Sequence, residues 1–160
     1  MAVVADKTGS LIAASARIGA MVSGAPVEIK ETLTVFGEKI GVAFQLVDDV
    51  IDIASESFES GKTPGTDLRE GVPTLVTLNV IAMNRPEDAE LIALLKAPIK
   101  DEATVQSVIK TLRAHPALEL SRQQTIQYAQ DARKALGPLP VNDVTGALYS
   151  LCDAIIDRSA

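Results

Sequence analysis

Apolar residues recur at the spacing of α-helices along almost the whole chain. The pattern predicts helices over residues 8–23, 27–54, 74–83, 101–113, 116–136 and 144–158, and a further helix that opens at 86–88. Gly24 and Pro26 separate the first two, as a left-handed cap and a helix-starting proline. The longest irregular stretch, 55–65, is rich in Ser, Gly and Glu. Because no segment alternates like a strand, we expect an all-α protein.

The composition is that of a globular protein. The chain has 160 residues, of which 47% are hydrophobic, and the length suits one domain. The uncharged stretch 72–84 contains a proline and is shorter than the roughly 18 residues of a membrane span. An Asp-Lys pair at 6–7 interrupts the place where a signal peptide needs its apolar core. With a single cysteine, Cys152, no internal disulfide can form, so we expect a cytoplasmic protein without a transmembrane segment.

The net charge of −6 is concentrated in one segment. Residues 48–70 contain seven acidic and two basic side chains, and the rest of the chain is nearly neutral. An acidic chain with five aromatic residues and no tryptophan lacks the basic surface and the stacking platform of a nucleic-acid-binding protein. We therefore expect no nucleic-acid partner.

The acidic segment begins inside the longest predicted helix. Around that helix Gly41, Gln45, Asp48, Asp49 and Asp52 share an arc of roughly 100°. The other side is apolar, with Ile40, Ala43, Phe44, Leu46, Val47, Val50 and Ile51. We expect the polar stripe to face a cleft and the apolar side to be buried.

Three carboxylates within two helical turns repel one another, and a divalent cation would offset that repulsion. Mg²⁺ takes one or two carboxylates, keeps waters and leaves positions for phosphate oxygens. Lys62, in the loop behind the helix, and Lys7-Thr8, at the predicted start of the first helix, could bind a phosphate. The alternative is that these residues form only a solvated face and a polar loop. One histidine and one cysteine cannot form a zinc site; we expect Cys152 in the core and His115 in a loop or helix cap.

Two motifs together resemble a known family. The first is Gly41-Val-Ala-Phe-Gln-Leu-Val-Asp-Asp-Val-Ile-Asp52, and the second is Gly61-Lys-Thr-Pro-Gly-Thr-Asp-Leu-Arg-Glu-Gly71. They resemble the second aspartate-rich region of the trans-isoprenyl diphosphate synthases, the polyprenyl synthetase family. Lys7-Thr8 and the C-terminal segments 128–136 and 155–158 also resemble this family. The resemblance implies a helical bundle of the isoprenoid synthase type, with only its C-terminal helices present.

The resemblance implies a magnesium-dependent prenyltransferase of isoprenoid biosynthesis, which condenses isopentenyl diphosphate with an allylic diphosphate. Asp48, Asp49 and Asp52 would bind the Mg²⁺ that holds the allylic diphosphate. Lys7 and Lys62 would contact that diphosphate. Gln45 and the backbone of Lys7-Thr8 would face the allylic carbocation.

The chain departs from the family pattern in one large respect. Members carry two aspartate-rich motifs on facing helices, and this sequence contains one. The resemblance therefore implies that residues 1–160 are the C-terminal part of a single domain, competent only with a missing N-terminal half. Val72 also stands where the family often has a lysine. The alternatives are a non-catalytic partner or regulatory subunit, and a helical interaction module. Keeping the aspartates, both lysines and Gln45 favours the synthase, for which a homodimer is the family expectation.

Overall fold

The computed structural model of the chain describes residues 2–55 and 63–159. Within these ranges every regular element is a helix, which confirms the all-α prediction. The described residues contain no helix that is both long enough and apolar enough to cross a bilayer. The chain divides into two compact units. The long-helix unit comprises the chain up to residue 47 together with residues from 124 onward, and the short-helix unit comprises residues 48 to 123.

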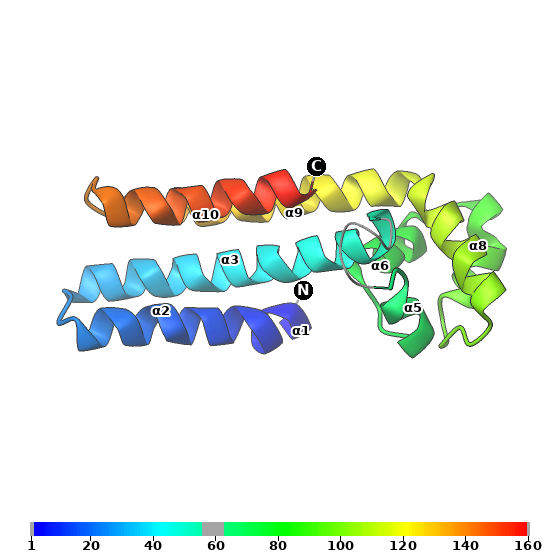
Figure 1. The fold of residues 1–160 in the computed structure, drawn as a ribbon, viewed down its shortest axis with the longest axis horizontal. Helices are drawn as coiled ribbons and strands as arrows, with labels where there is room; N and C mark the ends of the chain where they lie inside the picture. Colours follow the sequence, from blue (N-terminus) through cyan, green and yellow to red (C-terminus); the bar gives the residue numbers. More distant parts are fainter. Residues whose placement is uncertain (1, 56–62, 160) are drawn as a thin grey trace. The chain divides into compact units, whose positions relative to one another are not determined.

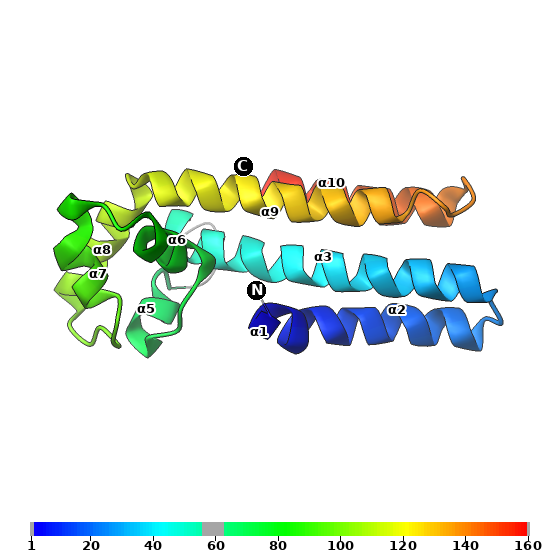
Figure 2. The same ribbon diagram turned by 180° about the vertical axis from the view of Figure 1, so that it is seen from behind.

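The long-helix unit is built from extended helices. Three consecutive elements form one helical run, α1 (Ala2–Val4), the π-helix η1 (Ala5–Gly9) and α2 (Ser10–Val22). Gly24, with a φ of 72°, ends that run, as predicted. The chain then returns in α3 (Val27–Ala54), whose bounds match the prediction. The second half of α9 (Pro116–Ala135) and α10 (Asp143–Ser159) complete the unit. Figures 1 and 2 show α3 between α2 and the pair formed by α9 and α10.

The core of this unit lies along α3 and the two C-terminal helices. Its buried side chains include Phe36, Ile40, Ala43, Leu46, Val47, Ala129, Ala132, Leu136, Cys152 and Ile155. Cys152 is fully buried, as predicted. The prediction was wrong for Phe44, which is 40% exposed and has the Arg158 guanidinium 5.8 Å from its ring centroid. Phe44 lies at the edge of the apolar side, about 100° from Gln45 around α3, where the buried face ends.

The short-helix unit contains the end of α3, the beginning of α9 and several shorter helices between them. These are α5 (Thr66–Glu70), α6 (Leu75–Met83), the 3-10 helix η2 (Pro86–Asp88), α7 (Ala89–Leu94) and α8 (Glu102–Arg113). They enclose a core that includes Val50, Ile53, Leu68, Val76, Val80, Leu91, Val105, Ile109 and Leu112. Thr74 and Asp101 cap α6 and α8 through their side chains. Their capping fixes where two of the predicted helices begin.

A partly exposed arginine, Arg85, and two buried side chains, Asp88 and His115, form one cluster in the short-helix unit. Arg85 donates from Nε and Nη2 to the two carboxylate oxygens of Asp88, at 2.7 and 2.8 Å. The Nε2 atom of His115 lies 3.0 Å from Oδ2 of Asp88, and its Nδ1 accepts the backbone N–H of Ala117 at 3.0 Å. Because Nδ1 accepts, Nε2 carries the proton and donates to Asp88. The prediction of His115 as a cap is confirmed, since it caps the start of α9.

Replacing Asp88 with asparagine should lower the melting temperature at neutral pH. The Arg85 guanidinium and then His115 hold the pKa of the Asp88 carboxyl well below its usual range. The folded state thus favours the charged form, and that stabilisation is present above the unfolded-state pKa of about 3.9 and is lost as the pH falls below it. Thermal unfolding followed by circular dichroism should show the difference between variant and wild type shrinking below about pH 4. A difference that stays constant down to pH 2 would contradict the assignment.

Candidate functional site

Two aspartates at the end of α3 hold the beginnings of the next two helices. Asp49 accepts the backbone N–H of Leu75, the first residue of α6, on Oδ2 at 2.9 Å. Asp52 accepts the backbone N–H of Thr66, the first residue of α5, on Oδ1 at 3.3 Å. The backbone carbonyl of Asp52 also accepts the N–H of Gly65 at 3.0 Å. The first N–H groups of a helix have no partner inside it, so these carboxylates supply one.

The second oxygen of Asp52 is in a different situation. The side chain is only 8% exposed, and Oδ2 is buried without a hydrogen-bond partner. Burial raises the pKa of this carboxyl above its ordinary value, against the opposing effect of the N–H groups of Thr66, Asp67 and Gly65 and the charge of Arg69. A buried carboxylate oxygen without a donor is costly for the fold. A cation at this oxygen would remove that cost.

The two other aspartates of the predicted metal site differ from Asp52 in their surroundings. Asp48 is half-buried and precedes Asp52 by four residues, so both project from the same side of α3. One oxygen of Asp49 is engaged by Leu75. Among the described residues no group of three or more His, Cys, Asp or Glu side chains is arranged to hold a metal. Hard oxygen donors from one or two carboxylates are what Mg²⁺ takes from proteins that also bind phosphate.

In the long-helix unit the fold brings two of the predicted residues into contact. Thr8 donates from Oγ1 to Oε1 of Gln45 at 3.1 Å, and both side chains are half-buried. Lys7, beside Thr8, is exposed. The family resemblance implies that Gln45 and the backbone of Lys7-Thr8 face the same part of the substrate. The hydrogen bond between the Thr8 and Gln45 side chains links residues 37 positions apart.

The prediction that Lys7-Thr8 opens a helix was wrong. Both residues lie within η1, inside a helical run that begins at Ala2. The N–H of Ser10 bonds to the carbonyl of Ala5, five residues back, as in a π-turn. Backbone N–H groups inside such a run are engaged along the helix, so they do not form the free N-terminus that would favour an anion. The first helical residues, Ala2–Val4, are apolar. Their spacing alone did not distinguish a helix from an extended segment before Lys7.

One cation near the acidic motif was missed. Arg69 donates from Nε and Nη2 to the carboxylate of Glu102 at 3.0 and 2.8 Å, and from Nη1 to the carbonyl of Pro64 at 2.7 Å. Burial raises the pKa of Asp52, and the charge of Arg69 partly opposes that rise. The signal available in the sequence was that Arg69 and Lys62 are the two bases of the acidic segment. Lys62 itself lies outside the described residues.

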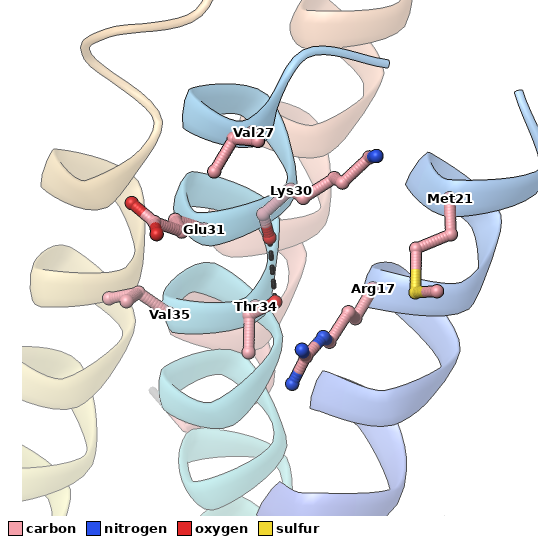
Figure 3. A pocket seen from close by; sticks show the side chains of 7 residues that line it. All are labelled: Arg17, Met21, Val27, Lys30, Glu31, Thr34 and Val35. Atoms are coloured by element: carbon pink, nitrogen blue, oxygen red, sulfur yellow. Dashed lines mark hydrogen bonds between the residues drawn. The ribbon is translucent and has the colours of Figure 1, made fainter. Parts of the chain in front are cut away.

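A pocket in the long-helix unit is separate from all of these residues. It has a volume of about 670 Å³ and lies between α2 and α3 (Figure 3). Arg17 and Met21 of α2 line it together with Val27, Lys30, Glu31, Thr34 and Val35 of α3. Figure 3 shows Glu31 and Val35 pointing away from α2. Thr34 donates to the backbone carbonyl of Lys30 at 2.6 Å, so its hydroxyl hydrogen is used within α3. None of the predicted site residues lines this pocket.

Comparison with known proteins identifies close similarity to one enzyme family. The family model described as polyprenyl synthetase matches residues 1–112. The chain is 48% identical over 158 residues to nonaprenyl diphosphate synthase of Mycobacterium tuberculosis, covering 98% of this chain and 47% of that protein. It is 36% identical to heptaprenyl diphosphate synthase component 2 of Geobacillus stearothermophilus, covering 91% and 44%.

Solved structures give the same result for the fold. Geranylgeranyl pyrophosphate synthase from Corynebacterium glutamicum, complexed with calcium and isoprenyl diphosphate, superposes with a TM-score of 0.89 at 38% identity. The match covers 99% of this chain and 49% of that structure. The chain thus spans about half the length of the relatives that it matches.

Proposed function

The chain belongs to the polyprenyl synthetase family, and we propose that it supplies half of the active site of a trans-polyprenyl diphosphate synthase. This enzyme condenses isopentenyl diphosphate with an allylic diphosphate and depends on Mg²⁺. The observation that carries the proposal is the buried, unpartnered Oδ2 of Asp52, four residues after Asp48 on α3. An oxygen of this kind has a physical reason to be present if a cation binds there.

Asp48 and Asp52 are the residues that we assign to the metal. Bound Mg²⁺ would neutralise charge that develops on the departing diphosphate. We also assign Asp49 to the metal, because it is part of the motif that resembles the family. Its hydrogen bond to the backbone of Leu75 positions the start of α6. Lys7 and Lys62 are assigned to the diphosphate oxygens as fixed positive charges.

Thr8 and Gln45 are assigned to the allylic end of the substrate. The Thr8 hydroxyl donates a hydrogen bond to Oε1 of Gln45. Its oxygen lone pairs are therefore directed away from Gln45 and can face positive charge on the allylic carbon. A held dipole of this kind stabilises charge without having to reorganise during the reaction.

Replacing Asp52 with asparagine should abolish the stabilisation of the folded chain by magnesium and diphosphate. In excess Mg²⁺ and inorganic diphosphate, ligand at about 100 times its Kd stabilises the wild type by about 2.7 kcal/mol, and the melting temperature rises accordingly. Asp52→Asn should show no such rise, whereas Glu31→Gln, an exposed acid on the same helix, should behave as wild type. Differential scanning fluorimetry measures all three.

The same variant has a second expected signature in the absence of metal. Because burial raises the pKa of Asp52, its charge destabilises the folded state above the unfolded-state pKa of about 3.9. Asp52→Asn should then be at least as stable as wild type at pH 7, and the difference should vanish as the pH falls toward 3. A large loss of stability in metal-free buffer, together with an unchanged response to Mg²⁺, would show that Asp52 serves only as a structural anchor for α5.

We assign the apolar face of α2 to contact with the other half of the domain. Only Ala13 and Ala20 of α2 are buried, while Leu11, Ile18, Met21 and Val22 are 67%, 58%, 54% and 82% exposed. Exposed apolar side chains gathered on one helix favour a partner surface. The relatives are about twice as long as this chain, which supports their remaining half as the occupant.

Replacing Ile18 with glutamate should prevent this association. Burying an isoleucine contributes about 1.5–3 kcal/mol, so losing it costs about 10- to 100-fold in affinity before the added charge is counted. The partner is the half of the mycobacterial nonaprenyl diphosphate synthase that this chain does not match, and calorimetry measures the affinity. Leu151→Glu, at an exposed apolar position of α10, is the matched control. Equal weakening by both variants would contradict the assignment, and self-association of the chain through Ile18 would replace it with a homodimer.

A further inference from the structure

Two glycines of α3, Gly37 and Gly41, lie directly against the backbone of the η1–α2 run. A Cβ atom at Gly37 would lie 2.8 Å from Cα of Ala13, and one at Gly41 would lie 2.9 Å from Cα of Gly9. Real Cβ atoms do not approach backbone so closely, so any side chain at these two positions would force the helices apart. Gly37, Gly41 and Gln45 follow one another at intervals of four residues, on one side of α3.

The contact at Gly41 reaches Thr8 directly. A Cβ atom there would lie 3.2 Å from the backbone carbonyl oxygen of Thr8. One helical turn further along α3, Gln45 accepts the hydrogen bond from the Thr8 hydroxyl. At Gly37, by contrast, the contacted backbone belongs to Ile12 and Ala13. The two glycines thus make similar contacts, but only that of Gly41 involves the predicted site residue.

Gly9, the last residue of the π-helix η1, also lies close to α3. Gly9 closes η1 and is buried, and a Cβ atom on it would lie 3.1 Å from the carbonyl oxygen of Glu38 and 3.3 Å from Cγ2 of Val42. The chain therefore has glycine on both sides of the contact that adjoins Thr8. The wider turn of η1 is continuous with the α-helices on either side, and such single turns often occur at functional sites.

We propose that Gly41, together with Gly9, is a positioning residue that holds the Thr8 hydroxyl on Gln45 and so sets the dipole at the allylic end of the substrate. The inference rests on the proposed function for its catalytic consequence. The positional part rests only on the contacts of the long-helix unit. Gly41 acts through Thr8 and does not itself touch substrate in this assignment.

The experiment compares four alanine variants in the chain assembled with the complementary half. Gly41→Ala should reduce kcat on the order of 10²-fold, because a shift of about 1 Å at a positioned group can cost that much. KM for the allylic diphosphate should change less than about twofold, since the assigned metal ligands Asp48 and Asp52 lie outside the contact at Gly41. Gly37→Ala presses on backbone equally hard but away from Thr8, and should lower the melting temperature similarly while leaving most of kcat. Gly19→Ala, which meets nothing within 4 Å, should match wild type in kcat. Gly9→Ala presses on the same contact from the other side and replaces Gly41→Ala if that variant does not fold.

A double-variant cycle separates positioning from general destabilisation. Thr8→Val removes the hydroxyl, whereas Thr8→Ser keeps it and should retain most of the activity. If Gly41→Ala acts through Thr8, the pair Gly41→Ala with Thr8→Val should lose little more kcat than either single variant. Multiplying losses would overturn the proposal, and so would equal loss of kcat in Gly37→Ala and Gly41→Ala.

Hydrogen exchange on the same variants keeps the inference testable if the proposed function fails. A wild-type assembly that forms no product would refute the function and leave the positional part intact. Gly41→Ala should still speed amide exchange in peptides covering residues 8–10 more than Gly37→Ala does, because the contact that it opens adjoins them. Equal exchange of those peptides in the two variants would overturn the positional inference.

Discussion

The purified 160-residue chain is expected to form no polyprenyl product above background when given Mg²⁺, isopentenyl diphosphate and an allylic diphosphate. The sequence contains one aspartate-rich motif, whereas the family resemblance implies two on facing helices. With one motif, only one of the two sets of carboxylates that would hold metal ions at the diphosphate is present. The charge that develops on the leaving diphosphate is then poorly stabilised. Addition of the unmatched half of the mycobacterial relative should restore turnover. A radiolabelled isopentenyl diphosphate incorporation assay measures both conditions.

The control for that experiment is the Ile18→Glu chain mixed with the same half, which should stay inactive at concentrations where the wild-type mixture is active. Robust product from the chain alone would contradict the half-site proposal. Association without any turnover would instead favour a non-catalytic partner or regulatory subunit. An in-frame Asp-Asp-x-x-Asp in the coding DNA immediately upstream would favour a single longer chain.

Replacing Asp48 with asparagine in the assembled protein should lower kcat on the order of 10²-fold or more. The substitution keeps the size of the side chain but removes a charge from the metal, and loss of one preorganised charge stabiliser costs about 3–4 kcal/mol of barrier. Asp48 is half-buried and lies on the same side of α3 as Asp52. Steady-state kinetics at saturating Mg²⁺ measures the loss.

Glu31→Gln removes the same charge from an exposed position of the same helix and is the matched control. It should leave kcat within about twofold of wild type, as exposed substitutions away from a site generally do. If both variants lost activity equally, the acidic residues of α3 would act through general negative charge. The solvated-face alternative would then be favoured over a metal site.

The helices were predictable because their ends carry strong local signals. The bounds of α3 follow from Pro26 and from the polar stretch behind Ala54, and α6 begins after a threonine cap. The five-residue helix α5 was missed because it is too short for a periodic pattern. It lies between Gly65 and Gly71, both at positive φ, which read in the sequence only as loop residues.

The side-chain arrangement of the site was only partly predictable. Helical geometry placed Asp48 and Asp52 on one stripe, since that depends on spacing within α3 alone. The hydrogen bonds of Asp49 to Leu75 and of Asp52 to Thr66 join residues 26 and 14 positions apart, and depend on how the chain returns after α3. The π-turn at η1 was likewise invisible, because an α-helix and a π-turn share the same residue preferences. The roles of Lys7, Lys62 and the three aspartates stay predictions.

The most direct test of the central claim is calorimetric titration of inorganic diphosphate into the assembled protein, with and without Mg²⁺. If Asp48 and Asp52 hold a metal that bridges to diphosphate, each ligand must raise the affinity of the other, because linkage is reciprocal. We predict binding that strengthens markedly with Mg²⁺ in wild type and in Glu31→Gln, and that loses this dependence in Asp48→Asn and Asp52→Asn. Diphosphate binding that is indifferent to Mg²⁺ in wild type, or equally dependent on it in all four proteins, would contradict the account.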